Sequence, residues 1–453
     1  MKKITTCLAL VGLLALGVPA IAEIGTIDDV PAATLLLPYF EVDLGNANGV
    51  TTLFSINNAS ATAVLAHVTM WTDESIPTLD FDVYLTGYDV QTINLRDIFN
   101  GTLPVTASAG QDPKDTISPK GPVSQDINFA SCATFFPFSN PALNSTLLTH
   151  IRNAHTGRAS TVFSGRCSGF DYGDNVARGY ITVDTVNQCN LLFPNSAGYF
   201  TTVATFQNVL WGDYFYVNQE QNYAQGETLV HSEACQPGNG YIGYVGNGAG
   251  NCPFTPGEYT FYGRYVAGAG TDQREPLATT FATRYINGGG FTGGTDLIVW
   301  RDSKTAGTGA NGPFSCAAAD GPAWYPLNQQ QVVAFDEAEH AVEICIAGGD
   351  NVSPPIGEIQ TCFPLEAQRV SLAGGANNPG DDPAPPFTFG WMYLNLNTST
   401  GAVGGIFDPT AQAWVTTVMS ANGRFSVGYD AIQLDNALYT NGTAGRTLPA
   451  PTQ

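Results

Sequence analysis

Short stretches in which apolar and polar residues alternate recur along the whole chain. In 79–85, LDFDVYL, the apolar residues occupy every second position, with Asp80, Asp82 and Tyr84 between them. Because successive side chains of a β-strand point to opposite faces, this pattern predicts a strand with one apolar face. Similar stretches, rich in β-branched or aromatic residues and bounded by Gly, Asn, Asp or Pro, cover 51–58, 63–71, 179–187, 213–219, 296–302, 340–346, 390–397 and 423–434. No stretch keeps a helical period beyond about two turns, so we predict an all-β fold of Ig-like or jelly-roll-like β-sandwiches.

Three pairs of similar segments suggest two related domains in tandem. In chain order, residues 51–73 resemble 279–302, 179–187 resemble 390–398, and 199–205 resemble 413–419. The order and spacing agree while the identity is low, so the alternative is chance recurrence of threonine pairs and aromatic strands. We expect a first β-sandwich domain over 23–235 and a second over 255–453, with Trp71 and Trp300 as equivalent core residues.

Two long stretches rich in Pro, Gly and Asp interrupt the strand pattern. They are 101–127 in the first predicted domain and 373–386 in the second. Loops of this length in compact domains are typically functional or mobile, and the sequence leaves both open. We therefore expect long loop insertions in both sandwiches.

The N-terminus and the charge indicate an exported protein. Residues 1–22 combine two lysines, a short apolar run and an Ala-Ile-Ala end, the pattern of a signal peptide. The full chain carries a formal net charge of −22, which disfavours binding to nucleic acid or anionic lipid. No apolar run is long enough for a membrane span. We expect an extracellular, cell-surface or periplasmic location.

The cysteines predict disulfides. Eight follow the predicted signal peptide: Cys132, Cys167, Cys189, Cys235, Cys252, Cys316, Cys345 and Cys362. An even number in an exported chain predicts up to four bonds, and the absence of CxxC disfavours a metal site. Four cysteines in each half suggest two bonds in each domain. The competing pairing joins Cys235 to Cys252 across a glycine-rich loop, and spacing does not choose between them.

The aspartates of the 79–85 strand are a candidate calcium site. Two residues apart on one face, Asp80 and Asp82 would lie about 6.5–7 Å apart, a separation suited to paired carboxylates. Calcium would need further oxygens, for which Asp73, Glu74 and Asp89 are the nearest candidates. The favoured alternative is that these carboxylates form the solvent face of an ordinary strand. Calcium is thus the one cofactor that the sequence suggests.

The aromatic segment 209–223 is a candidate ligand surface. Trp211, Tyr214 and Tyr216 could form a row on which sugar rings stack, with nearby Asn and Gln as hydrogen-bond partners. The alternative is that they belong to a sandwich core. Glycans or other surface proteins are the expected partners.

Catalytic motifs are missing from the sequence. Neither G-x-S-x-G nor H-E-x-x-H occurs, and none of the histidines has a recognisable nucleophile partner. We therefore predict a non-catalytic structural or binding protein of the cell surface, matrix or periplasm. The alternative is a protein that binds or cleaves carbohydrate.

Three segments carry a resemblance to known proteins. Residues 52–99, 208–217 (NVLWGDYFYV) and 295–302 (TDLIVWRD) resemble a set of exported, β-rich bacterial proteins of no known function. The resemblance implies a bacterial exported protein and brings no activity, ligand or catalytic residue.

Overall fold

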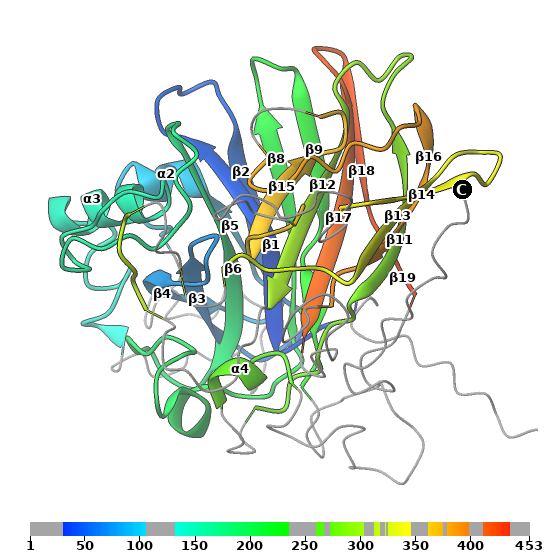
Figure 1. Ribbon diagram of the computed structural model, residues 1–453. Helices are drawn as coiled ribbons and strands as arrows, with labels where there is room; N and C mark the ends of the chain where they lie inside the picture. The colour runs from blue at the N-terminus through cyan, green and yellow to red at the C-terminus, as the bar shows by residue number, and fades with distance from the viewer. Residues whose placement is uncertain are drawn as a thin grey trace, which may run out of the picture.

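The regular secondary structure of the computed structural model consists mainly of antiparallel β-sheets (Figure 1). The structure describes residues 30–105, 132–234, 260–266, 272–302, 312–317, 322, 325–345, 361–374, 378–397 and 411–434. The predicted signal peptide lies outside these residues, as does most of the 101–127 insertion. Four sheets form the all-β sandwich fold that the strand pattern predicts. No helix among the described residues is long and apolar enough to cross a membrane.

The first sandwich contains two sheets with the orders β10–β1–β6–β3–β4 and β5–β2–β8–β9, and β7 pairs with β2. Its strands are β1 (Thr34–Asp43), β2 (Thr51–Asn58), β3 (Val64–Trp71), β4 (Pro77–Leu85), β5 (Val90–Asn94), β6 (Val176–Val186), β7 (Leu210–Trp211), β8 (Asp213–Asn218), β9 (Tyr223–Thr228) and β10 (Val230–Ser232). Between strands lie α2 (Leu95–Phe99), α3 (Ser145–Ala154) and a π-helical turn, η2 (Tyr199–Val203).

The second sandwich contains sheets with the orders β14–β13–β16–β11–β19 and β15–β12–β17–β18. Its strands are β11 (Thr280–Ile286), β12 (Gly294–Asp302), β13 (Gln331–Phe335), β14 (Ala341–Ile344), β15 (Ala367–Ser371), β16 (Phe389–Asn395), β17 (Gln412–Ala421), β18 (Phe425–Asp430) and β19 (Ile432–Gln433). The short helix α4 (Gly263–Val266) lies in the connection between the sandwiches.

The two sandwiches have the same topology. Taken in chain order, β11 to β16 correspond to β1 to β6, and β17, β18 and β19 correspond to β8, β9 and β10. Under this correspondence the order β14–β13–β16–β11–β19 becomes β4–β3–β6–β1–β10, and β15–β12–β17–β18 becomes β5–β2–β8–β9. Each sheet of the second sandwich therefore has the same strand order as one sheet of the first.

A pair of hydrogen bonds found in both sandwiches shows which residues of the two correspond. In the first sandwich the Thr52 hydroxyl accepts from the Glu41 amide and donates to the Glu41 carbonyl, both at 3.0 Å. In the second, the Thr295 hydroxyl accepts from the Ile286 amide at 2.8 Å and donates to the Ile286 carbonyl at 2.9 Å. Thr52 and Glu41 are thus the counterparts of Thr295 and Ile286.

A glycine also takes the same place in both sandwiches. A Cβ on Gly179 of β6 would lie 2.0 Å from the carbonyl oxygen of Trp71, and one on Gly390 of β16 would lie 1.8 Å from that of Phe335. Only glycine allows so close a backbone approach. The next residues, Tyr180 and Trp391, each stack on the aromatic ring of the neighbouring strand.

The predicted sequence repeat agrees with this correspondence at only one of its three segments. Residues 179–187 and 390–398 start at the paired glycines. Residues 51–73 cover β2 and β3, whereas 279–302 cover β11 and β12, so that match is shifted by one strand. Residues 199–205 contain a π-helical turn, whereas 413–419 lie in β17. Trp71 and Trp300 are both buried, but they are not counterparts, because Trp71 corresponds to Phe335.

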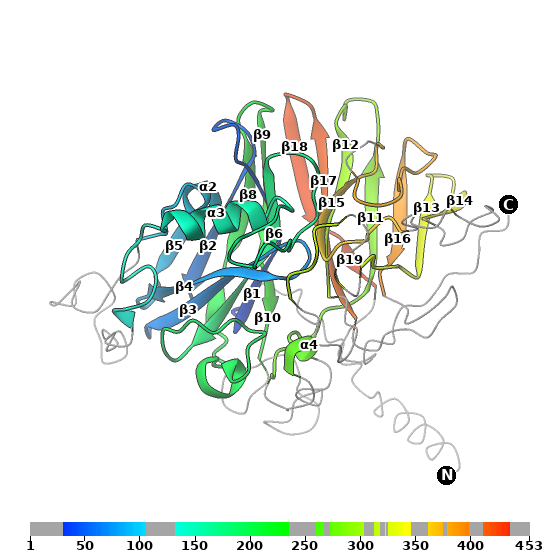
Figure 2. The ribbon, with the colours of Figure 1, turned by 60° about the vertical axis from the view of Figure 1, so that its left-hand side comes forward.

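In the sheet β15–β12–β17–β18, the strands β12 and β17 are covered on both faces. In β12, Leu297 and Val299 belong to the core of the second sandwich, whereas Ile298 and Trp300 join the core of the first. This double burial explains the nearly continuous apolar run of β12. The edge strands β9 and β18 lie side by side in both views (Figures 1 and 2).

Three disulfides join described cysteines: Cys132–Cys189, Cys167–Cys316 and Cys345–Cys362. Disulfides of this kind are typical of proteins that fold in an oxidising compartment. Cys167–Cys316 joins the two halves of the chain, so the prediction that each domain holds its own bonds is wrong for this pair. Cys235 and Cys252 lie outside the described residues.

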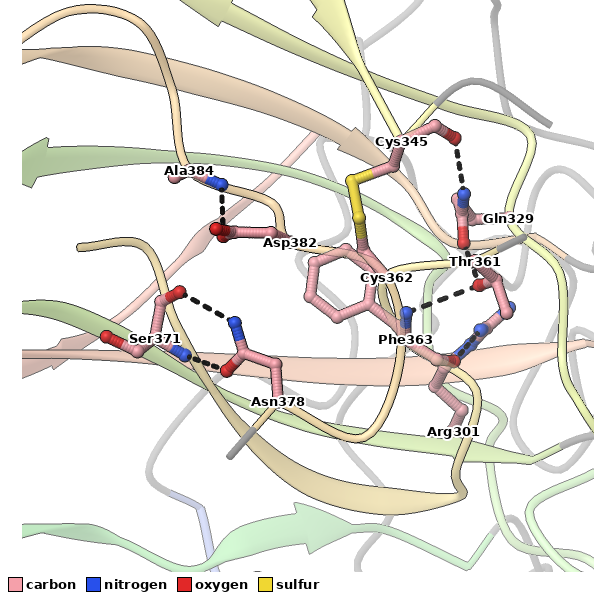
Figure 3. The surroundings of a disulfide bond; sticks show 10 residues. All are labelled: Arg301, Gln329, Cys345, Thr361, Cys362, Phe363, Ser371, Asn378, Asp382 and Ala384. Atoms are coloured by element: carbon pink, nitrogen blue, oxygen red, sulfur yellow. Dashed lines mark hydrogen bonds between the residues drawn. A yellow bond between two sulfur atoms is a disulfide. The ribbon is translucent and has the colours of Figure 1, made fainter. Parts of the chain in front are cut away.

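The Cys345–Cys362 bond joins the end of the edge strand β14 to the residues that precede β15 (Figure 3). The Gln329 side chain donates to the Cys345 carbonyl at 2.8 Å. Part of the predicted 373–386 loop is held nearby, because the Asn378 side chain exchanges two hydrogen bonds with the Ser371 backbone (Figure 3).

Candidate functional site

The aspartates of β4 do not face solvent. Asp80 is 8% exposed and Asp82 is fully buried. Asp82 accepts from the Asn190 amide at 3.2 Å, and its own amide donates to the Phe136 carbonyl. The solvent-face interpretation is therefore wrong, because chain segments joined by the Cys132–Cys189 bond cover this face, and alternation along one strand cannot reveal such a cover.

A histidine on β3 lies between the two carboxylates of β4 and is hydrogen-bonded to that of Asp82. His67 Nδ1 lies 2.9 Å from Asp82 Oδ1, and His67 Nε2 lies 3.8 Å from Asp80 Oδ2. Burial alone would lower the pKa of His67, but Asp82 and Asp80 outweigh it and raise that pKa. Burial raises the pKa of Asp80 to about 6. When His67 is protonated, its imidazolium supplies between the two carboxylates the positive charge that a cation would bring.

Asp89 does not join this cluster. Its carboxylate accepts from the Thr86 and Val90 amides at the β4–β5 turn. Among the described residues, no group of three or more His, Cys, Asp or Glu side chains has an arrangement that could hold a metal ion. The structure thus brings Asp80 and Asp82 together with His67 and leaves Asp89 in a local turn.

A second set of buried acids lies in the β3–β4 turn. Asp73 and Glu74 are both buried, and the Asp73 carbonyl accepts from the backbone amides of Glu366 and Ala367 in the second sandwich. Burial raises the pKa of Asp73 to about 7 and that of Glu74 well above its usual value. This turn is therefore part of the contact between the sandwiches.

We expect the protein to be more stable at pH 5 than at pH 8. A carboxyl whose folded pKa is raised binds its proton more tightly when folded, so the stability from Asp73 is lost between about pH 4 and 7. The raised pKa of His67 acts in the same direction, since its contribution is complete below its unfolded pKa and lost as pH rises through the folded one. Asp73→Asn should raise the free energy of unfolding at pH 8 by about 2–4 kcal/mol, measured by urea unfolding.

The exposed Asp171, in the segment that contacts Asp73, provides the control for this measurement. Asp171→Asn should leave the pH dependence unchanged. Equal stability of the wild type at pH 5 and pH 8 would contradict the prediction.

The aromatic row predicted on β7 and β8 is split between two faces. Tyr214 and Tyr216 are buried, and Tyr216 donates to the Tyr39 carbonyl at 2.7 Å. Trp211 instead shares the exposed face with Phe215. The three predicted residues therefore do not form one ligand surface. The alternation of strand side chains along 211–216 could have predicted this, because it places Trp211 on the face opposite to Tyr214 and Tyr216.

A polar cleft of about 570 Å³ lies where the two sandwiches meet. Strands β1, β6, β12 and β15 contribute to its lining, together with the turns of the β8–β9 and β17–β18 hairpins. Ligand sites occur preferentially at such interfaces between domains. The lining of the cleft combines the charged residues Glu41, Arg178, Asp296 and Arg369 with the aromatic residues Tyr39, Tyr172, Tyr223 and Phe425.

Arg369 joins the two sandwiches inside the cleft. Its guanidinium lies 3.1 Å from Glu41 Oε1 on β1 and 2.7 Å from Asp296 Oδ2 on β12. Burial alone would lower the pKa of Arg369, but Asp296 and Glu41 raise it well above its usual range. Both carboxylates are thus engaged by one fixed cation rather than available to a substrate oxygen.

A second arginine, Arg178 on β6, also lines the cleft. Arg178 forms two 2.8 Å hydrogen bonds with Asp174, and its guanidinium lies 4.0 Å from the centre of the Tyr172 ring. The buried Tyr172 hydroxyl has no hydrogen-bond partner among the described residues. Burial raises the pKa of Tyr172 well above its ordinary value, so this hydroxyl stays a neutral donor.

Sequence reasoning did not find this cleft. Its charged residues come from four strands of two sandwiches, and each stands alone in an ordinary strand. The scarcity of basic residues, 17 in 453, is the only feature that singles out the arginines.

No protein-family model, no curated protein and no solved structure matches this chain. The resemblance to exported, β-rich bacterial proteins therefore stays a prediction.

Proposed function

We propose that the protein is an exported, non-catalytic binding protein of the cell surface, matrix or periplasm, whose ligand site is the cleft between its sandwiches. The observation that carries the proposal is Arg369, which is held at once by Glu41 of the first sandwich and Asp296 of the second. A cleft fixed from both sides keeps its shape, and a preorganised site loses less entropy on binding.

The side chains of the cleft favour an uncharged, hydroxyl-rich ligand of the saccharide class. Arg369 and Arg178 are each neutralised by carboxylates, so neither has unpaired charge to offer a phosphate or carboxylate ligand. Amides from Asn218, Asn378 and Asn422 line the same space. Tyrosine rings beside amide and guanidinium groups suit the apolar faces and hydroxyls of sugar rings.

A glycan array probed with the full exported chain, with and without calcium, tests this proposal. Tyr172→Phe removes one hydroxyl donor from the cleft and keeps the ring, so it should weaken binding of any glycan hit by about 2- to 10-fold. Tyr88→Phe, at an exposed tyrosine outside the cleft, is the matched control and should bind as the wild type.

Absence of binding in both arms of the array would overturn the saccharide assignment. Release of shortened glycan products would instead show a carbohydrate-cleaving enzyme and overturn the non-catalytic assignment.

A further inference from the structure

The outer face of the β15–β12–β17–β18 sheet is an internal docking surface. Trp300, Trp414 and Val418 on this face belong to the core of the first sandwich. Trp300 packs edge-on against Tyr180 of β6, with ring centroids 6.0 Å apart. The chain therefore already contains one interface in which the outer face of a four-stranded sheet packs against the β1–β6 side of a neighbouring sandwich.

The corresponding face of the first sandwich, on β5–β2–β8–β9, is open. The register fixed by Thr52 and Thr295 makes Trp211 the counterpart of Trp414, Phe215 that of Val418 and Val90 that of Ala367. Trp211 is 42% exposed against 4% for Trp414, Phe215 is 45% against 1%, and Val90 is 55% against 0%. We call this open surface the donor face.

The receiving side of the internal interface also has an open counterpart, on the second sandwich. Tyr180, Glu41 and Arg178 of the first sandwich correspond to Trp391, Ile286 and Phe389 of the second. These three counterparts line an apolar groove of about 870 Å³, together with Met419, Tyr429 and Ile432. Phe389 is 51% exposed and Ile432 is 70% exposed. We call this groove the receptor groove.

The receptor groove is more apolar than the surface to which it corresponds. Where the internal interface has Glu41 and Arg178, the receptor groove has Ile286 and Phe389. On the donor face, Thr92 stands where the internal interface has Arg369. The counterparts of Arg369 and Glu41 are thus both uncharged. The donor face and the receptor groove can therefore pack together without leaving one member of this salt bridge unpaired.

We propose that the chain binds a second copy of itself head to tail, with the donor face of one copy in the receptor groove of the next. This contact would repeat the interface inside each chain. The two surfaces differ, so the contact is heterologous and leaves one donor face and one receptor groove at the ends of every assembly. The product is a ring or a filament of copies.

The charge of the chain makes this assembly dependent on salt. At −22 the copies repel one another, and added salt screens this repulsion while leaving the apolar contact in place. Association should therefore strengthen between 0.02 and about 0.5 M salt, opposite to an interface held by ion pairs.

Sedimentation velocity of the full exported chain, over a series of protein and salt concentrations, tests the proposal. Phe215→Asp on the donor face and Phe389→Asp in the receptor groove should each weaken association at least tenfold. Leu191→Asp, at an exposed apolar residue on neither surface, should assemble as the wild type. Thermal unfolding of each variant within about 2 °C of the wild type confirms that the fold is retained.

An equimolar mixture of the Phe215→Asp and Phe389→Asp variants separates this arrangement from a symmetric dimer. The intact groove of the first variant should bind the intact face of the second, and growth should stop at two copies. Monomers at every protein and salt concentration, wild-type association by either variant, or a mixture that grows beyond two copies would overturn the proposal.

Discussion

Trp414→Ala is expected to lower the free energy of unfolding by about 3–5 kcal/mol, and Trp211→Ala by less than about 1 kcal/mol. The two tryptophans occupy corresponding positions in corresponding sheets of the two sandwiches. Trp414 is buried against the first sandwich and its indole donates to Asp430 at 3.2 Å, whereas Trp211 is exposed. Truncation therefore opens a cavity at the junction in one case and removes a surface side chain in the other.

Urea unfolding measures the free energy of unfolding of both variants. Far-UV circular dichroism is the readout, because it follows the backbone and not the fluorescence of the tryptophans that are replaced. The measurement belongs at low protein concentration and low salt, where head-to-tail association contributes least. Similar losses for the two variants would contradict the assignment of the β15–β12–β17–β18 sheet as a layer shared by both cores.

Asp184→Ala should be comparably destabilising, by about 3–5 kcal/mol. Asp184 is fully buried and accepts hydrogen bonds from Tyr199 and Tyr262, both at 2.9 Å, while the Arg274 guanidinium lies 3.3 Å away. Its removal leaves the buried Arg274 charge with Asp272 as its remaining carboxylate, at 3.4 Å. The buried charge of Arg274 would then be only partly compensated, and the hydroxyls of Tyr199 and Tyr262 would lose their acceptor, which are both costly defects in a core.

Two further variants separate charge from hydrogen bonding at this site. Asp184→Asn should cost less than Asp184→Ala, because the second sandwich carries an asparagine, Asn395, at the corresponding position. Asp174→Ala breaks a partly exposed pair with Arg178 and should cost no more than about 1 kcal/mol. Thermal and urea unfolding of the three variants provide the comparison, and a loss at Asp184 no larger than at Asp174 would contradict the prediction.

Alternation of apolar and polar residues predicted the fold class and about half of the strands. It missed strands such as β1 and β13, whose side chains are buried at nearly every position. For 79–85 it placed the apolar stripe correctly, since Leu79, Phe81, Val83 and Leu85 are all in the core. It failed on the other face, because Asp80 and Asp82 are covered by segments more than 50 residues away in the chain. Alternation reports which side chains share a face, and it carries no information about what packs on that face.

The relation between the sandwiches shows a similar limit. Gly179 and Gly390 could be matched from sequence because a close backbone approach permits no other residue. Threonine pairs and terminal tryptophans could not be matched reliably, because many strands accept them. The cleft could not be predicted, since Arg369 acquires its partners Glu41 and Asp296 only when two sandwiches pack together.

The shared sheet also bears on how this chain can be divided. A cut in the connection between the sandwiches would leave Ile298 and Trp300 of β12 on the surface of one fragment and remove part of the core from the other. The Cys167–Cys316 bond crosses the same boundary and closes 149 residues of chain into one covalent loop. Two units with the same topology thus share one core and one covalent bond, and we expect that neither half would fold on its own.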